Sequence, residues 1–115
     1  MSRRDDRVRL RHMLEHAREA CNMAAGRSRD DLDTDRQLSL ALTRLMEIIG
    51  EAAARVGKET SSELRDVPWP QIVALRNRLI HGYDEVDHDI LWNVISDDLP
   101  PLVRQLEALQ ATEGE

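Results

Sequence analysis

The sequence predicts an all-α fold, an antiparallel bundle of four main helices joined by short links. Apolar residues recur at three- and four-residue intervals in long segments, as on one face of a helix. Strand signals are weak, because Phe is absent, Tyr occurs once and no alternating run ends in a hairpin turn. The 115 residues suit a single domain, 1–115, and we expect the tail after about residue 110 to fray.

Two amphipathic segments predict the first two helices. The first ends at Gly26, and its apolar positions have helical spacing: Leu10, Met13, Leu14, Ala17, Cys21 and Ala24. The second begins at Thr34, which together with Gln37 resembles a capping box. Its apolar stripe stops at Gly57 and comprises Leu38, Leu42, Leu45, Ile49, Ala52, Ala53 and Val56. Close approach of another helix would explain Gly50 inside this stripe.

The second half of the chain predicts two further helices. Residues 58–67 form a polar connection, with one helical turn expected around residues 62–65. The third helix is expected from about Pro70 to Ile80 and should end near Gly82. The fourth begins near Asp87, and we expect it to be kinked or split at Pro100-Pro101, because proline lacks the backbone N–H that a helix interior uses.

Composition and charge exclude several classes of protein. No apolar run approaches the length of a membrane span, and the first residues lack the apolar stretch of a secretory signal. The single cysteine, Cys21, forms no internal disulfide, so a cytoplasmic location is expected. The net charge of −6 argues against tight binding to a long polyanion. However, residues 1–29 carry eight Arg against four Asp and Glu, which suits either a charged helix surface or local phosphate contacts.

The third predicted helix carries polar groups that suit a reaction. At about 100° per residue, Arg76 falls within the face formed by Ile72, Val73, Leu75, Leu79 and Ile80, whereas Arg78 points away. Asn77 and His81 are four residues apart and share one edge of the helix. One interpretation is structural, an ion pair for Arg76 and a cap for His81 at the helix end. The other is an active site.

The reaction that this set would support is RNA cleavage without a metal. An imidazole exchanges protons near neutral pH, and a guanidinium stabilises charge on a phosphate. The nucleophile would be the ribose 2′-hydroxyl, so DNA would not be cut. A single His81 is insufficient for two proton transfers, and a two-fold dimer would supply a second imidazole.

The stretch 76–83, RNRLIHGY, resembles the motif of the HepT-like family within the HEPN superfamily, in which Arg and His are separated by four residues and a Tyr follows. The resemblance extends to residues 44–53, RLMEIIGEAA, to Pro68-Trp69, and to Val86-Asp87 with Leu91-Trp92. It covers about residues 5–110. The spacing of Arg and His alone is weak evidence, and the joint match with the flanking segments carries the resemblance.

The resemblance implies a function for the motif residues. Arg76 and His81 would be the catalytic pair of a ribonuclease toxin, Asn77 a supporting residue, and the site would form at a homodimer cleft. The usual partner of this family is a minimal nucleotidyltransferase antitoxin of the MntA type, which transfers AMP to the motif tyrosine, here Tyr83. From the residues alone, Tyr83 could equally cap a helix or pack in the core.

Other candidate residues point less clearly to a site. His12 and His16 have a metal-ligand spacing but lack a third ligand nearby, so an exposed surface is the simpler interpretation. His88 suits a helix-cap region, Trp69 and Trp92 suit core or interface anchors, and either Glu47 or Glu51 could pair with Arg76. We expect no bound metal and no cofactor, since the sequence has no Gly-rich phosphate loop, no Cys/His cluster and no Ser–His–Asp signature.

Two alternatives share the predicted fold. The chain could be a non-catalytic helical adaptor that binds the nucleotidyltransferase or presents its substrate. It could also be a simple dimerising bundle in which the 76–83 stretch is structural. Expression without a partner separates them, because a nuclease should arrest its host and the other two should be tolerated.

Overall fold

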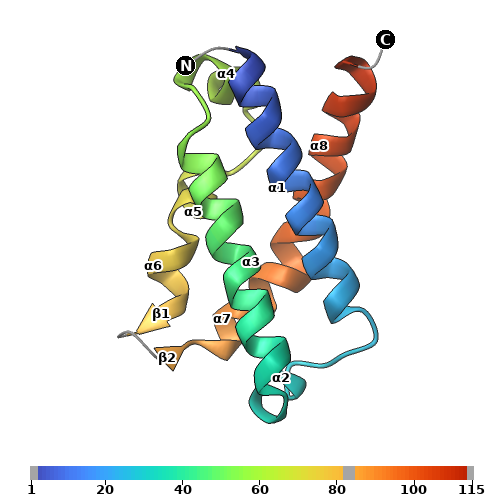
Figure 1. Ribbon diagram of the computed structural model, residues 1–115, viewed down its shortest axis with the longest axis vertical. Coiled ribbons are helices and arrows are strands. Elements are labelled where there is room, and N and C mark those ends of the chain that lie inside the picture. The colour runs from blue at the N-terminus through green and yellow to red at the C-terminus, as the bar shows by residue number, and fades with distance from the viewer. Residues whose placement is uncertain (1–2, 82–84, 114–115) are drawn as a thin grey trace.

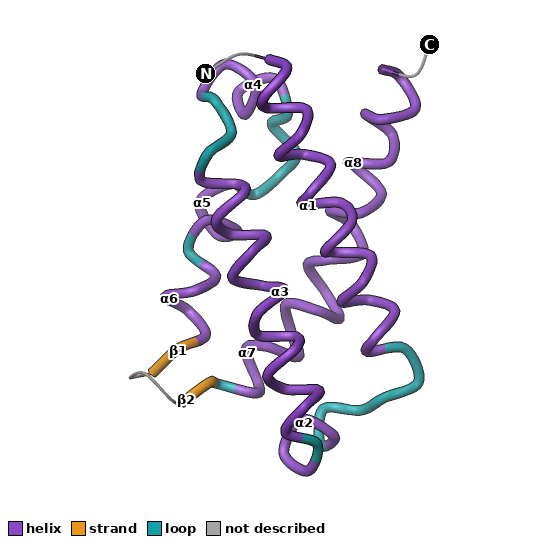
Figure 2. Tube along the Cα trace, viewed as in Figure 1, coloured by secondary structure: helices purple, strands orange, loops and turns teal. Residues whose placement is uncertain are grey.

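The computed structural model describes residues 3–81 and 85–113, and of residues 3–4, 80–81 and 112–113 it describes the backbone alone. The chain forms an antiparallel helical bundle with extents of 44 × 29 × 19 Å (Figure 1). Three long helices run along the long axis: α1 (Arg3–Ala24), α3 (Arg36–Ala54) and α8 (Leu99–Glu113). The shorter α5 (Trp69–Val73) and α6 (Leu75–Leu79) follow one another beside α3 (Figure 2). The predicted all-α class is therefore confirmed.

The first helix, α1 (Arg3–Ala24), packs against both α3 and α8. Its buried side chains recur on one face and comprise Leu10, Met13, Leu14, Ala17 and Ala20. Gly26 follows the helix with φ of 76°, a conformation that glycine adopts without steric cost. The predicted first helix and its glycine stop are both confirmed.

The central helix, α3 (Arg36–Ala54), follows the short α2 (Asp31–Thr34). Its N-cap is Asp35, whose carboxylate accepts a hydrogen bond of 3.0 Å from the backbone N–H of Leu38. The predicted cap at Thr34 was wrong by one residue, because Thr34 closes α2. Asp and Thr both suit this position, so residue type alone did not separate the two.

Gly50 of α3 allows α5 (Trp69–Val73) to approach closely. A Cβ at position 50 would lie 3.1 Å from the carbonyl oxygen of Ile72 and 3.6 Å from that of Val73. The expected close approach of another helix is thus confirmed, and the contact lies within one chain.

The polar connection contains α4 (Lys58–Glu63), which starts four residues earlier than the predicted turn. The buried carboxylate of Asp6 on α1 explains this start. It accepts hydrogen bonds from the Gly57 backbone N–H at 3.0 Å and from the Thr60 hydroxyl at 2.6 Å. A carboxylate from another helix therefore holds the start of α4 through its N-cap residue and the hydroxyl of Thr60.

The predicted third helix is divided. After α5, Ala74 interrupts the helix with φ −82° and ψ 1°, and α6 (Leu75–Leu79) follows. The chain then leaves the helical conformation in β1 (Ile80–His81), which pairs antiparallel with β2 (Glu85–Val86).

The last helical pass consists of α7 (His88–Asn93), the π-helical turn η1 (Val94–Asp98) and α8 (Leu99–Glu113). Asp87 caps α7 by accepting from the backbone N–H of Ile90 at 3.0 Å. In η1 the N–H of Leu99 bonds to the carbonyl of Val94, and Pro100 and Pro101 follow without N–H groups to continue the α-helical pattern. The predicted irregularity at the prolines is confirmed as a join between helical pieces.

The core lies between α1, α3 and the α7–α8 pass, and α5 and α6 close it with Ile72, Leu75 and Leu79. Within residues 3–81 and 85–113, no helix is long and apolar enough to span a bilayer.

Candidate functional site

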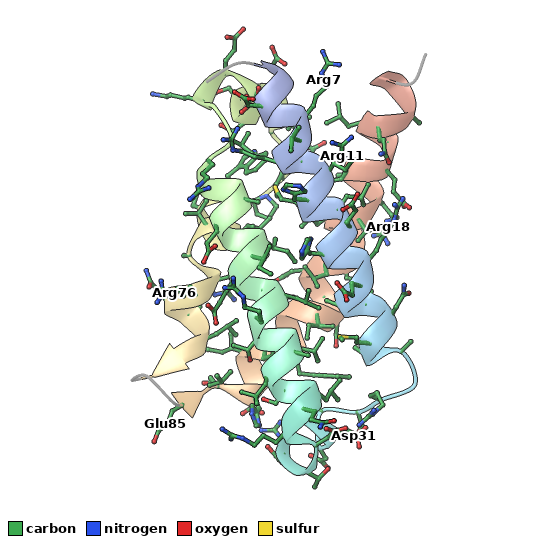
Figure 3. The ribbon with its side chains drawn as sticks, viewed as in Figure 1. Arg7, Arg11, Arg18, Asp31, Arg76 and Glu85 are labelled. Carbon is green, nitrogen blue, oxygen red and sulfur yellow. The ribbon has the colours of Figure 1, made fainter. Side chains whose placement is uncertain are left out.

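Two exposed polar side chains lie on α6. Arg76 and Asn77 both face solvent, while Leu75 and Leu79 on the same helix are buried at 2% and 0% exposure. Figure 3 shows Arg76 pointing away from the bundle. The buried leucines hold the helix on α3, so the polar pair is presented from a fixed base.

The predicted orientation of Arg76 was wrong. The prediction placed it within the apolar face and placed Arg78 outside it, but Arg76 is exposed and Arg78 is half-buried. The predicted apolar face was too wide, because it included Val73, which is 42% exposed. The buried stripe consists of Ile72, Leu75 and Leu79, and Arg76 lies at its edge.

Arg76 forms no ion pair with any residue that the structure describes, so neither predicted glutamate pairs with it. Both glutamates instead face Arg44 on their own helix. Its Nη1 lies 3.5 Å from Glu47 and 3.8 Å from Glu51. The guanidinium of Arg76 is therefore available to an anion from outside the described chain.

The motif histidine lies beyond the helix end. The backbone of His81 belongs to β1 and pairs with Glu85, two residues after α6 ends at Leu79. The predicted helical edge shared by Asn77 and His81 was therefore wrong. The side chain of His81 and the whole of Tyr83 lie outside the described residues, so their roles remain predictions.

The strand pair that carries His81 is closed at its base. The backbone N–H of Asp87 donates to the carbonyl of Leu79 at 2.8 Å, and Ile80 pairs with Val86. This closure places His88 next to the end of α6.

A polar cluster that sequence reasoning missed lies beside this closure. The Nδ1 atom of His88 is 2.7 Å from the carboxylate of Asp33, and its Nε2 atom is 3.0 Å from the Ser39 hydroxyl. Arg29 joins Asp33 and Asp89, with both contacts at 2.6 Å. The hydrogen bond from His88, and then that from Arg29, hold the pKa of Asp33 below its ordinary value.

Within this cluster, Ser39, His88 and Asp33 are linked in the order of a Ser–His–Asp triad, although the sequence shows no such signature. Its members are 49 and 55 residues apart, and no local spacing could have indicated their contact. The available signal was the cap at Asp87, which correctly marked a helix start and left open what His88 contacts.

The other candidates take structural places. His12 is exposed and lies edge-on to His16, whose Nδ1 is 2.8 Å from the carbonyl of His12. No group of three metal-ligating side chains occurs in the part of the chain that the structure describes. Trp69 donates its indole N–H to the Leu64 carbonyl at 3.0 Å, and Trp92 packs half-buried against the core.

The positive charge of residues 1–29 is partly neutralised. Arg18 pairs with Glu107, while Arg27 pairs with Asp31 at 3.4 Å and Asp35 at 2.8 Å. Arg7 and Arg11 stay exposed, with no ion pair to a described residue. Ion pairs within the chain therefore take up only part of the positive charge of residues 1–29.

The chain is similar in sequence to a family of known proteins. Residues 13–109 match the sequence model of the family described as Ribonuclease HepT-like. A protein of Methanocaldococcus jannaschii named as an RNase is 31% identical over 93% of this chain and 98% of its own length. One of Caldanaerobacter subterraneus subsp. tengcongensis, also named as an RNase, is 34% identical over 90% and 93%. One of Thermococcus cleftensis named as a ribonuclease HepT is 32% identical over 70% and 74%. No solved structure matches the chain.

Proposed function

The chain belongs to the HepT-like ribonuclease family, and from this premise we propose that it is a toxin that cleaves RNA without a metal ion. The observation that carries the proposal is the exposed Arg76, which has no ion pair to a described residue and lies on the helix leading into His81. An arginine that binds substrate must stay free for it, and Arg76, unlike Arg7 and Arg11, which are also exposed, lies in the stretch 76–83 that resembles the family's motif.

The proposed reaction is an attack by the RNA on itself. His81 accepts the proton of a ribose 2′-hydroxyl, and the 2′-oxygen forms a bond to the adjacent phosphorus. The bond from phosphorus to the 5′-oxygen breaks, and that oxygen takes up a proton. The products are a 2′,3′-cyclic phosphate and a 5′-hydroxyl. Arg76 holds the phosphate as its charge develops, and Asn77 beside it supports the contact.

The reaction requires a proton donor as well as an acceptor, which supports a homodimer with two His81 side chains at one cleft. Gly50 gives no support to this dimer, since its close contact lies within the chain. The outer face of α5 and α6 suits the interface better, because Val73 is 42% exposed and lies three residues before Arg76. Two copies meeting there would bring the 76–83 stretches of both chains together.

Neutralisation is proposed to act at Tyr83, two residues from His81. A nucleotidyltransferase of the MntA type would transfer AMP from ATP to the Tyr83 hydroxyl. A phosphate-bearing group at this position would obstruct the cleft and compete with RNA for Arg76. We place this pair of proteins in the cytoplasm, where a free thiol such as that of Cys21 stays reduced.

The decisive experiment incubates purified, unmodified protein with total RNA in excess EDTA, beside a His81→Ala control. Cleavage is expected to persist with the chelator, to leave 2′,3′-cyclic or 3′-phosphate ends, and to disappear in the variant. Activity that is lost in EDTA and restored by magnesium would contradict the mechanism. Intact RNA with the wild-type protein would favour a non-catalytic adaptor.

The regulatory part has its own test. Co-expression with the nucleotidyltransferase should add AMP mass increments to the peptide that carries Tyr83. Tyr83→Phe retains the ring without the hydroxyl, so it should stay active and escape neutralisation. Equal silencing of that variant without formation of a tight complex would rule out the modification.

A further inference from the structure

Asp33, Ser39 and His88 are brought together from three separate helices of the chain. Asp33 lies on α2, Ser39 in the first part of α3, and His88 at the start of α7. The three side chains form one chain of contacts, 2.7 Å from Asp33 to His88 and 3.0 Å from His88 to Ser39. We call this set the His88 cluster.

The chemistry of the atoms assigns the direction of each hydrogen bond. A carboxylate only accepts, so Nδ1 of His88 carries a proton and donates it to Asp33. In the neutral imidazole, Nε2 then accepts from the Ser39 hydroxyl. A hydroxyl that donates to a histidine held by a carboxylate is also the arrangement of an activated nucleophile.

The surroundings of Ser39 argue against a nucleophile. Ser39 is 7% exposed, within the helix α3. Its own N–H bonds to the carbonyl of Asp35 at 3.1 Å, and the N–H of Leu38 bonds to the Asp35 carboxylate. Acyl transfer requires free donors directed at the developing oxyanion, and these two backbone N–H groups are already occupied.

The place of His88 in the chain indicates a different role. His88 directly follows Asp87, whose backbone N–H donates a hydrogen bond of 2.8 Å to the carbonyl of Leu79 at the end of α6. Val86 precedes them and pairs with Ile80, next to His81. Any shift of His88 away from α2 and α3 therefore moves the base of the segment that carries His81.

A second tie supports the same anchoring point. Arg29 contacts Asp33 and Asp89, each at 2.6 Å, so the start of α7 is joined to α2 at Asp89 as well as at His88. The side chain of His88 is 23% exposed and its contact with Ser39 is partly buried. Water therefore competes less for this contact than for a contact on an open surface.

We propose that His88 is a positioning residue for the ribonuclease motif, acting through Asp33 and Ser39 to fix β2 and hence the place of His81. This inference rests on the proposed function, because it assigns His81 to the reaction. It predicts that loss of the His88 cluster lowers turnover without weakening the contact of Arg76 with RNA. Small displacements of a reacting group lower rates by as much as roughly 100-fold.

The test compares four variants with the wild-type protein. His88→Ala removes both contacts. His88→Asn keeps a donor near the Nδ1 position, His88→Gln keeps a polar group near the Nε2 position, and Ser39→Ala removes only the hydroxyl. His12→Ala, which removes an exposed imidazole on α1, is the matched control.

We expect His88→Ala to lower kcat on RNA roughly 10- to 100-fold with KM nearly unchanged. His88→Asn should recover most of this loss, because the contact with Asp33 has a charged acceptor and the contact with Ser39 does not, and His12→Ala should match wild type. A kcat loss in His88→Ala that merely follows the loss of folded protein, seen by thermal melting, would overturn the proposal. Unchanged kcat would overturn it as well.

Hydrogen exchange gives a readout that needs no RNA cleavage. Amides of residues 79–81 and 85–88 should exchange roughly ten-fold faster in His88→Ala, while those of α1 stay unchanged. If the wild-type protein fails to cut RNA but this difference appears, the proposed function is wrong and the anchoring stands. No difference would remove the anchoring itself. A fluorophosphonate probe that labels Ser39 would identify it as a nucleophile and would overturn the positioning role.

Discussion

The long helices and the motif segment of this protein are built differently. Helices α1 and α3 span 22 and 19 residues, whereas α5 and α6 contain 5 residues each and β1 and β2 contain 2 each. The long helices hold one another through a continuous apolar face. The motif segment, by which we mean α5, α6, β1 and β2, is held by buried side chains of α5 and α6 and by contacts near Asp87 and His88. Stability and activity should therefore respond to different substitutions.

The largest expected effect is the loss of RNA cleavage in Arg76→Ala, a substitution that should leave stability nearly unchanged. Arg76→Ala should lower RNA cleavage by roughly 10²–10³-fold, the usual effect of removing one group that stabilises transition-state charge. The free energy of unfolding should change by less than about 0.5 kcal/mol, because Arg76 is exposed and has no ion pair with a described residue. Thermal melts beside single-turnover cleavage rates measure both quantities.

Two controls make that experiment specific. Arg104→Ala removes an exposed guanidinium from α8 and should change neither quantity. Leu79→Ala lies three residues after Arg76, is fully buried, and should lower the free energy of unfolding by about 2–5 kcal/mol. If Arg76→Ala melts as early as Leu79→Ala, the arginine is structural and the catalytic assignment is wrong.

The regular parts of the fold could be predicted because their signals are local. Leucines at helical spacing, the glycine stop at Gly26 and the cap at Asp87 each depend on residues within one or two turns of a helix. The same reasoning failed at Ala74, because alanine favours helix and nothing in its residue type marks an interruption. Counting Val73 as core then displaced the predicted apolar face onto Arg76.

The site could be predicted only as far as local sequence reaches. The motif indicated the segment that carries the candidate site, and the structure places Arg76 on the exposed side of α6. The His88 cluster depends on the packing of α2, α3 and α7, which sequence spacing does not encode. The roles of His81 and Tyr83 stay predictions, since their side chains lie outside the described residues.

A smaller effect is expected where the two regions touch. In Gly50→Ala the new Cβ would meet the backbone carbonyl of Ile72 at 3.1 Å, and a backbone cannot rotate away as a side chain can. The gain of about 1 kcal/mol in helix propensity competes with an overpacking cost of about 1–3 kcal/mol. We expect a net loss of stability and a shift of α5 and α6, measured as a lower melting temperature with reduced cleavage. A stabilised, fully active variant would show that α5 yields without cost.

The smallest effect is expected at the other end of the bundle, where Asp6 holds the start of α4 and Figure 1 places α4 far from β1. The hydrogen bond from Thr60, followed by that from the Gly57 N–H, holds the pKa of the Asp6 carboxyl below its ordinary value. A carboxyl with a lowered pKa in the folded state stabilises the fold above its unfolded pKa, and this contribution is lost as the pH falls through the folded value.

Asp6→Asn should therefore lower the free energy of unfolding by about 1 kcal/mol at pH 7, since it replaces hydrogen bonds to a charged acceptor with weaker ones. The difference from wild type should start to shrink below about pH 4, where Asp6 of the unfolded wild-type chain takes up a proton, and it should vanish only below the lower pKa of the folded state. Asp31, Asp33 and Asp35 also have lowered pKa values, so wild-type stability alone would mix four carboxyls, and only the difference between the two proteins isolates Asp6. Denaturant titrations from pH 3 to pH 7 measure it. RNA cleavage by the folded variant should equal that of wild type, because the contacts of Asp6 join α1 to the start of α4 and lie far from β1. A difference that stays constant into acid would show that Asp6 acts through its shape and not through its charge.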